Sequence, residues 1–364
     1  MRLIRVVYLS DARYEGGAER YLLRLAGGLD RHSFTPVLGL PRIATLDRLA
    51  QAAEEAGIEV QRHDDGPFAG ARSAAALLSS LKHLRPQIVH LNLPSTYDLA
   101  CNMAALVARV AGAEAIVSTE HIADILPSRR RVLMKRVALA AIDRVITISE
   151  MHRELLVGRH GVPARLIRVI LNGVEDPGTP LPRPPGAFEV LCVGVLEARK
   201  GQDLLVEALA SVRQAGVDMK LTLVGQGPDR ERLEDRVRER GLAPHVRFTG
   251  RLDSAWPEYR VARVVAIPSR IEGLPFAAIE GMAAGAVVVA AALPGMGEVI
   301  DPGRTGLLLP PDDVQAWVEG LIRLARDPEL CDRLAREGRR EYELRFTRER
   351  MVRETEHLYR EVLG

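Results

Sequence analysis

The sequence predicts an α/β protein built from two doubly wound domains in tandem. Short runs of β-branched residues alternate with helical patterns along almost the whole chain, as in βα units around parallel sheets. The 364 residues leave room for about two domains at roughly 150 residues each. Five prolines between Pro177 and Pro185 interrupt the pattern, because such a segment can continue neither a helix nor a central strand.

The strands expected in the first series are seven short β-branched runs, at residues 4–9, 36–40, 58–61, 88–91, 115–118, 144–148 and 167–170. The second series has five, at residues 190–195, 220–224, 246–248, 264–267 and 286–289. Helical patterns fill the intervals, and one charged helical segment is expected from Asp332 to Leu363.

These elements define the expected domain boundaries. We predict an N-terminal domain at residues 1–172, a proline-rich linker at 173–187, a second domain at 188–345 and a C-terminal helix at 346–364. The pattern leaves open whether that helix crosses back to the first domain.

Composition narrows the class of function. The 50 Lys and Arg residues against 48 Asp and Glu give a net charge of +2, which argues against a dedicated nucleic-acid binder. Cys101, Cys192 and Cys331 are far apart, so they support neither a disulfide framework nor a cysteine zinc site. The longest uncharged apolar run, residues 281–293, is shorter than the roughly 18 residues of a membrane-spanning helix. We expect a cytoplasmic protein without such a helix.

Doubly wound sheets bind ligands beyond the carboxyl ends of their strands. The loop after the first strand contains Gly16 and Gly17 at the start of a helix, where bare N–H groups favour an anion or a closely packed ligand. An ordinary tight turn has the same pattern. The dinucleotide fingerprint G-x-G-x-x-G is absent, so a tandem dinucleotide-binding dehydrogenase is disfavoured.

Two cations, Arg199 and Lys200, lie in the loop after the first strand of the second domain, and Lys200 is one of four lysines in the chain. They could neutralise a diphosphate leaving group without a metal, while a solvated charged turn is the alternative. The spacing does not match a Walker A loop, which disfavours a nucleoside triphosphatase.

The string from Glu272 to Glu280 combines two carboxylates with a helix start at Pro275. Backbone N–H groups near Gly273 and Leu274 would point at phosphates. Glu280 could accept hydrogen bonds from both hydroxyls of a ribose, and Glu272 could hold sugar hydroxyls.

In their order along the chain, these strings resemble the retaining glycosyltransferases of the GT-B fold, and among them glycosyltransferase family 4. The matching strings lie at residues 16–19, 119–121, 172–175, 200–201, 224–228, 246–250, 268–280 and 303–308. The resemblance implies two Rossmann-like domains facing a central cleft. It also implies transfer of a hexosyl group from a UDP- or GDP-sugar to a hydroxyl acceptor, with retention of configuration, in cell-envelope polysaccharide or glycolipid synthesis.

The resemblance also implies roles in the second domain. Glu280 would hold the ribose, Arg199 and Lys200 would offset the diphosphate charge, and Glu272 would contact the transferred sugar. The chain around Gly225 and Arg251 would border the nucleobase of the donor, so these two residues are expected to bind the donor.

In the first domain the resemblance implies that Gly16 and Gly17 allow close approach to the donor and acceptor, and that His121 lies near the sugar. It implies no cofactor and no metal. Val195 stands where the family often has an arginine, and the paired glycine of a later loop becomes the string Pro294-Gly295-Met296-Gly297. Two alternatives therefore stay open: a nucleotide-sugar 2-epimerase on the same scaffold, and a catalytically idle sugar-nucleotide-binding subunit.

A basic cluster of Arg129, Arg130, Arg131, Lys135 and Arg136 precedes an apolar run. As an amphipathic surface it could rest on an anionic membrane or meet a lipid-linked diphosphate acceptor. The solvated face of a core helix has the same composition. Both interpretations stay open, and peripheral contact with the cytoplasmic face of a membrane is a hypothesis.

Overall fold

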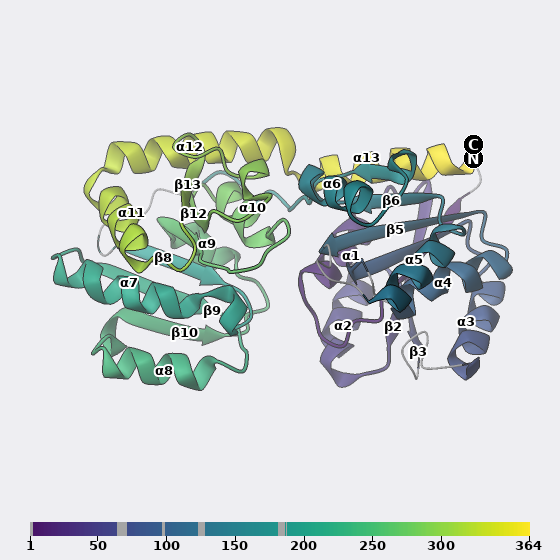
Figure 1. Ribbon diagram of the computed structural model, residues 1–364, viewed down its shortest axis with the longest axis horizontal. Helices are drawn as coiled ribbons and strands as arrows, with labels where there is room; N and C mark the ends of the chain where they lie inside the picture. The colour runs from purple at the N-terminus through teal and green to yellow at the C-terminus, as the bar shows by residue number, and fades with distance from the viewer. Residues whose placement is uncertain (1–2, 64–70, 97–98, 123–127, 181–185, 187) are drawn as a thin grey trace. The chain divides into compact units, whose positions relative to one another are not determined.

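The computed structural model describes residues 3–63, 71–96, 99–122, 128–180, 186 and 188–364, and the chain divides into two compact units (Figure 1). Unit 1 comprises Met1–Asn172 and Arg348–Gly364, and unit 2 comprises Gly173–Thr347. Each unit has one parallel sheet with helices on both faces. The predicted class, two Rossmann-like doubly wound domains, is confirmed.

The sheet of unit 1 has seven strands. Across the sheet they are β3 (Glu59–His63), β2 (Phe34–Pro41), β1 (Ile4–Leu9), β4 (Ile88–Ser95), β5 (Ala115–Ile122), β6 (Arg144–Thr147) and β7 (Ile167–Val169). Strand order reverses between β1 and β4, and ligands of such sheets bind beyond the carboxyl ends at this switch point. Strand β2 begins at Phe34 and therefore contains Pro36. A proline is tolerated at this position because β2 pairs with β3 only from Val37 onward.

The helices of unit 1 pack in two groups. α1 (Gly17–Gly28) contacts α2 (Asp47–Glu55) and α13 (Arg348–Leu363), whereas α4 (Leu99–Val110) contacts α3 (Ala71–Leu84) and α5 (Arg129–Leu139). α6 (Glu150–Gly158) packs on β6 and β7. The Ser128 and Ser149 side chains cap α5 and α6 by accepting hydrogen bonds from backbone N–H groups in the first turns.

The sheet of unit 2 has six strands. They are β10 (Val246–Gly250), β9 (Met219–Val224), β8 (Phe188–Val193), β11 (Val264–Ile267), β12 (Val287–Ala291) and β13 (Gly306–Leu309), in this order. The sequence did not predict β13, because four residues that begin with glycine and end before two prolines give little strand pattern.

One face of the unit 2 sheet carries α7 (Gln202–Gln214), α8 (Arg230–Glu239) and α11 (Val314–Arg326). The other carries α9 (Trp256–Val261) and α10 (Phe276–Ala283), with α12 (Pro328–Arg345) packed on α10. Short 3-10 turns in the two units occupy Ala44–Leu46, Ala164–Leu166, Ala198–Lys200, Ala243–His245 and Met296–Glu298.

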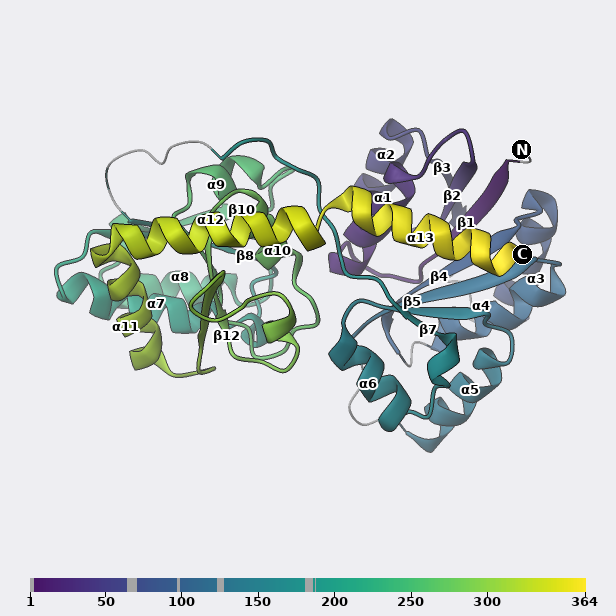
Figure 2. The same ribbon diagram turned by 90° about the horizontal axis from the view of Figure 1, so that it is seen from above.

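The segment expected to be helical, from Asp332 to Leu363, is helical but consists of two helices, α12 and α13. α12 ends at Arg345, and the fully buried Phe346 accepts a hydrogen bond through its carbonyl from Val174 N at 3.0 Å. The chain then begins α13, which belongs to unit 1 and lies along α1 (Figure 2). Within the described ranges, no helix is both long and apolar enough to cross a bilayer.

Candidate functional site

In unit 2 the loops after β8 and β11 lie against each other, because these strands are neighbours in the sheet. The backbone N–H of Arg270 donates to Arg199 O at 2.7 Å. Gly201 has a φ of +68°, and a Cβ there would lie 2.1 Å from Pro268 O. Only glycine allows this approach.

This approach brings Lys200 to Glu272. Lys200 Nζ lies 2.5 Å from Glu272 Oε1, and Ser269 Oγ donates to the same oxygen at 2.7 Å. Arg199 forms an ion pair with Glu197 at 2.5 Å. Each of the two cations therefore faces one carboxylate, and Lys200, with three N–H donors, can hold Glu272 and still donate to a ligand.

Glu280 is the fifth residue of α10 and is buried. The Tyr259 hydroxyl, from α9, donates to Glu280 Oε2 at 2.6 Å. This contact orients the carboxylate. No sequence pattern selects Tyr259, because an isolated tyrosine does not show which side chain it will contact.

The remaining predicted residues of unit 2 lie at other loops beyond the strands. Gly225, after β9, has a φ of +143° and donates from its N–H to Gly250 O, at the end of β10, at 2.9 Å. A Cβ on Gly225 would lie 1.9 Å from Gly194 O, so the β8 and β9 loops could not meet there with a larger residue. Arg251 is exposed beside Gly250, and Leu274 is buried before α10.

In unit 1 the glycine pair begins α1. The backbone N–H of Gly16 donates to Glu19 Oε2 at 3.0 Å, and Ser10 Oγ, just after β1, donates to Glu19 Oε1 at 3.3 Å. Through these two hydrogen bonds the buried carboxylate of Glu19 connects the glycine loop to the end of β1. Gly17 is exposed at the first helical position.

His121 lies near the end of β5. Its Nε2 is 2.8 Å from Asn92 Oδ1, and Asn92 Nδ2 donates to Ala18 O at 3.2 Å. The ring of Tyr21 meets the imidazole edge-on, with centroids 4.9 Å apart. Burial lowers the pKa of His121 to about 3, with a smaller contribution from His152, so the ring is neutral near pH 7. The structure thus brings the glycine loop and His121 together.

A second buried histidine connects this region to α13. His90 Nδ1 lies 2.5 Å from the Tyr359 hydroxyl, and His90 Nε2 lies 2.8 Å from Thr119 Oγ1. The Tyr359 hydroxyl donates to Tyr8 at 3.1 Å. Burial lowers the pKa of His90 to about 3, and it raises the pKa of Tyr359 well above its usual value. These groups form a neutral polar core under the site.

The basic cluster requires a correction. Lys135 is only 3% exposed, and its Nζ lies 2.5 Å from Glu120 Oε1, whose side chain is fully buried, and 3.0 Å from Asn102 Oδ1. Successive side chains of a strand point to opposite faces, so on β5 Glu120 points away from the face that carries His121. Lys135 contacts this buried carboxylate. Lys135 is therefore part of the core and not of a surface patch. The arginines of the cluster, Arg129, Arg130, Arg131 and Arg136, are exposed, as are Leu133 and Val137 on the same helix.

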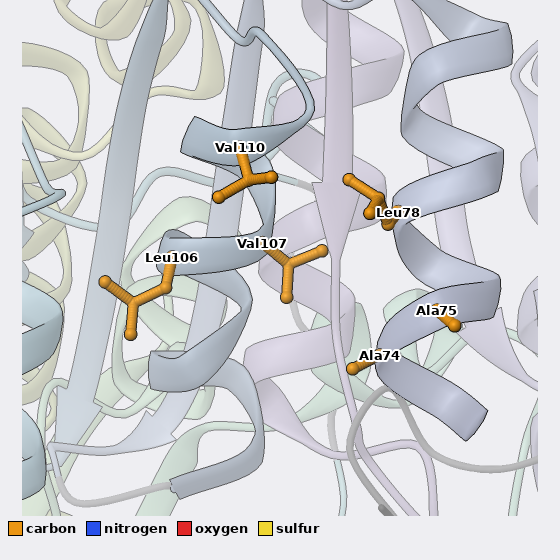
Figure 3. Close-up of a pocket in the computed structure, with 6 residues that line it drawn as sticks. All are labelled: Ala74, Ala75, Leu78, Leu106, Val107 and Val110. Atoms are coloured by element: carbon orange, nitrogen blue, oxygen red, sulfur yellow. The ribbon is translucent and has the colours of Figure 1, made fainter. Parts of the chain in front are cut away.

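An apolar groove lies between α3 and α4 of unit 1. Figure 3 shows its lining, which consists of Ala74, Ala75, Leu78, Leu106, Val107 and Val110. No side chain in this lining can form a hydrogen bond, so the groove does not suit a sugar nucleotide.

Comparisons with known proteins cover both units. Residues 15–176 match the family model described as Glycosyltransferase Family 4, and residues 179–341 match that described as Glycosyl transferases group 1. A D-inositol 3-phosphate glycosyltransferase from Saccharomonospora viridis is 31% identical over 258 residues, which cover 65% of this chain and 59% of that enzyme.

Another relative matches over most of both chains. The GDP-mannose-dependent alpha-(1-6)-phosphatidylinositol monomannoside mannosyltransferase of Mycobacterium tuberculosis is 29% identical over 359 residues, 89% of each chain. Among solved structures, Anabaena HepE in complex with UDP-glucose has a TM-score of 0.81 at 22% identity, covering 98% of this chain and 100% of that one. This structural likeness is one of fold.

Proposed function

The chain belongs to the glycosyltransferases, with a family 4 domain followed by a group 1 domain, and from this premise we propose that it transfers a hexosyl group from a UDP- or GDP-sugar to a hydroxyl acceptor with retention of configuration. The observation that supports this most is the contact of Lys200 with Glu272 beside the start of α10. It joins a cation suited to a diphosphate with a carboxylate suited to sugar hydroxyls. The UDP-glucose bound to Anabaena HepE and the GDP-mannose dependence of the mycobacterial relative support a sugar-nucleotide donor.

The chemical problem is to break the anomeric C–O bond while a diphosphate leaves as an anion. In our proposal Arg199, Lys200 and the backbone N–H groups at Gly273 and Leu274 stabilise that charge. Groups preorganised toward developing charge act this way, and losing one typically costs about 10²–10³ in rate. Glu280 holds the ribose, the chain around Gly225 and Arg251 borders the base, and Glu272 holds the sugar.

The acceptor oxygen bonds to the anomeric carbon on the face from which the diphosphate departs, which gives retention, and the leaving phosphate takes the proton of the acceptor hydroxyl. Unit 1 supplies the acceptor side through Gly16, Gly17 and His121. We propose that no metal or other cofactor takes part, so activity is expected to persist in excess EDTA, and complete dependence on a divalent ion would refute this part of the proposal.

Substitution tests the site assignment. We expect Lys200→Ala and Glu280→Ala each to lower turnover at least tenfold while far-UV circular dichroism stays unchanged. Lys220→Ala is the matched control, because Lys220 is an exposed lysine of β9 in the same unit. Parental turnover in both site variants would show that the donor site lies elsewhere.

Ligand screening identifies the donor. Thermal shifts with UDP, GDP, ADP and their sugars distinguish the bases, since a ligand at 100 times its dissociation constant stabilises by about 2.7 kcal/mol. The anomeric configuration of the product, read by NMR, tests retention. Conversion of the donor sugar without any acceptor would instead indicate the 2-epimerase, and tight binding without turnover would indicate the idle subunit.

We further propose that the acceptor is lipid-linked and meets unit 1 at an anionic membrane, in envelope polysaccharide or glycolipid synthesis. The exposed Arg129, Arg130, Arg131 and Arg136 beside exposed Leu133 and Val137 support this, as does the phosphatidylinositol monomannoside in the name of the mycobacterial relative. We expect more of the protein to sediment with anionic liposomes than with neutral ones. Replacing Arg129, Arg130 and Arg131 by glutamate should abolish this difference. Equal sedimentation with both would refute membrane contact.

A further inference from the structure

Asn92 connects two segments of the unit 1 site. It lies within β4, is fully buried, and contacts His121 of β5 on one side and Ala18, in the first turn of α1, on the other. Its side chain offers one acceptor, Oδ1, and two donors on Nδ2. The direction of each hydrogen bond can therefore be worked out from the partners.

The Ala18 carbonyl decides the orientation of the amide. A carbonyl oxygen only accepts, so the amide atom 3.2 Å from Ala18 O must be the nitrogen. Oδ1 then faces His121 Nε2 at 2.8 Å, and because Oδ1 only accepts, Nε2 must carry a proton. In a neutral imidazole the other nitrogen, Nδ1, then has a free lone pair.

Nδ1 is the one hydrogen-bonding atom of the ring left for a ligand. Among the residues that the structure describes, no group donates to it, and His121 is 7% exposed, so the ring is not fully sealed. The charged or titratable neighbours are Tyr21 of α1, against the ring, with His90 of β4 and His152 of α6 further off. Burial keeps these histidines neutral as well.

We propose that Asn92 is a positioning residue that holds His121 in the Nε2-protonated form, so that Nδ1 accepts a hydrogen bond from a ligand hydroxyl. A group at this place must therefore donate, which favours the hydroxyl of a sugar and disfavours a phosphate or carbonyl oxygen. The tautomer follows from unit 1 alone, whereas the identity of the hydroxyl as that of a sugar rests on the proposed function.

The tautomer can be measured directly in the intact protein. Long-range ¹H–¹⁵N spectra of the histidine-labelled chain distinguish protonated from unprotonated ring nitrogens, and His121→Gln assigns the signal by its loss. We expect His121 to show one protonated nitrogen, Nε2, and one unprotonated, Nδ1, at pH 7. A protonated Nδ1, an average of the two tautomers, or an imidazolium pattern at this pH would overturn the proposal.

Asn92→Asp provides the second test. A carboxylate still accepts from Nε2 but stabilises the charged ring, so His121 is expected to titrate at a higher pH than in the parent protein. Asn102→Asp is the matched control, because Asn102 is also a buried asparagine of unit 1 but forms its hydrogen bonds with Lys135 and Thr96 and not with His121. Its His121 signals should match those of the parent. If folded Asn92→Asp shows the same His121 signals as the parent, the role of Asn92 is refuted. If this variant does not fold, the tautomer measured in the parent protein tests the proposal.

The consequence for turnover is tested separately. In Asn92→Asp, protonation of Nδ1 removes the acceptor, so turnover should fall about tenfold per pH unit below the new pKa and recover above it. The parent and Asn102→Asp should show no such step. If His121 has the predicted tautomer but the protein transfers no sugar, the proposed function is refuted and the positioning role of Asn92 stands. If the protein transfers a sugar but His121 has the opposite tautomer, the positioning role is refuted and the proposed function stands.

Discussion

Replacing Lys135 by methionine isolates a buried charge and tests the orientation of α5. Lys135 and Glu120 have side chains 3% and 0% exposed and are 2.5 Å apart. Among the described residues, Glu120 Oε2 has no hydrogen-bond partner, so the carboxylate depends on the lysine. Breaking a buried pair from one side costs about 3–5 kcal/mol.

The same magnitude follows from protonation. Without Lys135, the Glu120 carboxyl is expected to become neutral in the folded state while it ionises in the unfolded state. Holding a group of ordinary pKa near 4.3 protonated at pH 7.5 costs about 4.4 kcal/mol, at about 1.4 kcal/mol per pH unit. The folded variant then binds more protons than the unfolded chain, so its deficit shrinks as pH falls, to about 1.6 kcal/mol at pH 5.5.

Urea unfolding measures the effect, with each variant compared to the parent at the same pH. Trp256 and Trp317 are the two tryptophans of the chain and both lie in unit 2, so tryptophan fluorescence reports unit 2 while circular dichroism reports both units. The circular dichroism transition should shift and the fluorescence transition should move less.

Two further variants serve as controls. Arg136→Met, at the exposed neighbouring position, should change stability by less than about 0.5 kcal/mol. Glu120→Leu combined with Lys135→Met should recover most of the loss, because apolar replacement of a buried pair is often neutral or stabilising. A loss below about 1 kcal/mol at pH 7.5, or one independent of pH, would place Lys135 in solvent and refute the reasoning.

Three other predictions address the site and its support. Tyr259→Phe removes the hydroxyl that donates to Glu280 and should lower the stability of unit 2 by about 1.5–3 kcal/mol, read by tryptophan fluorescence in urea; an unchanged midpoint would contradict it. Gly201→Ala would place Cβ 2.1 Å from Pro268 O, so the β8 and β11 loops should separate and turnover fall at least tenfold, with parental activity as the opposing result. Acid should destabilise unit 1, because His90, His121 and His152 are neutral when folded, with pKa values of about 3, 3 and 4. The unfolded chain takes up these protons below pH 6.5, so each histidine should cost about 1.4 kcal/mol at pH 5.5, and a urea midpoint for unit 1 that is equal at pH 7.5 and 5.5 would refute this.

The sequence predicted what depends on local pattern and missed what depends on distant partners. Runs such as that at residues 264–267 are β-branched and buried, so the strands of the interior were predictable. Charge along the chain does not show which way a helix faces, so Lys135 was assigned to the surface, although its partner lies 15 residues away. Asn92 and Tyr259 act through residues 29 and 21 positions away, and no spacing rule connects such pairs.

Because Arg348–Gly364 completes unit 1, this unit cannot finish folding in the order in which the ribosome makes it. The hydrogen bond from Tyr359 to Tyr8 joins residues 351 positions apart, and Tyr359 also packs beside Phe34. Unit 2 can leave the ribosome whole, whereas the first 172 residues must wait for α13. Contacts this distant in sequence slow folding. A nascent chain that stalls before residue 348 would present the Tyr8 and Phe34 region to water and to chaperones, so unit 1 closes its core only once α13 has been translated.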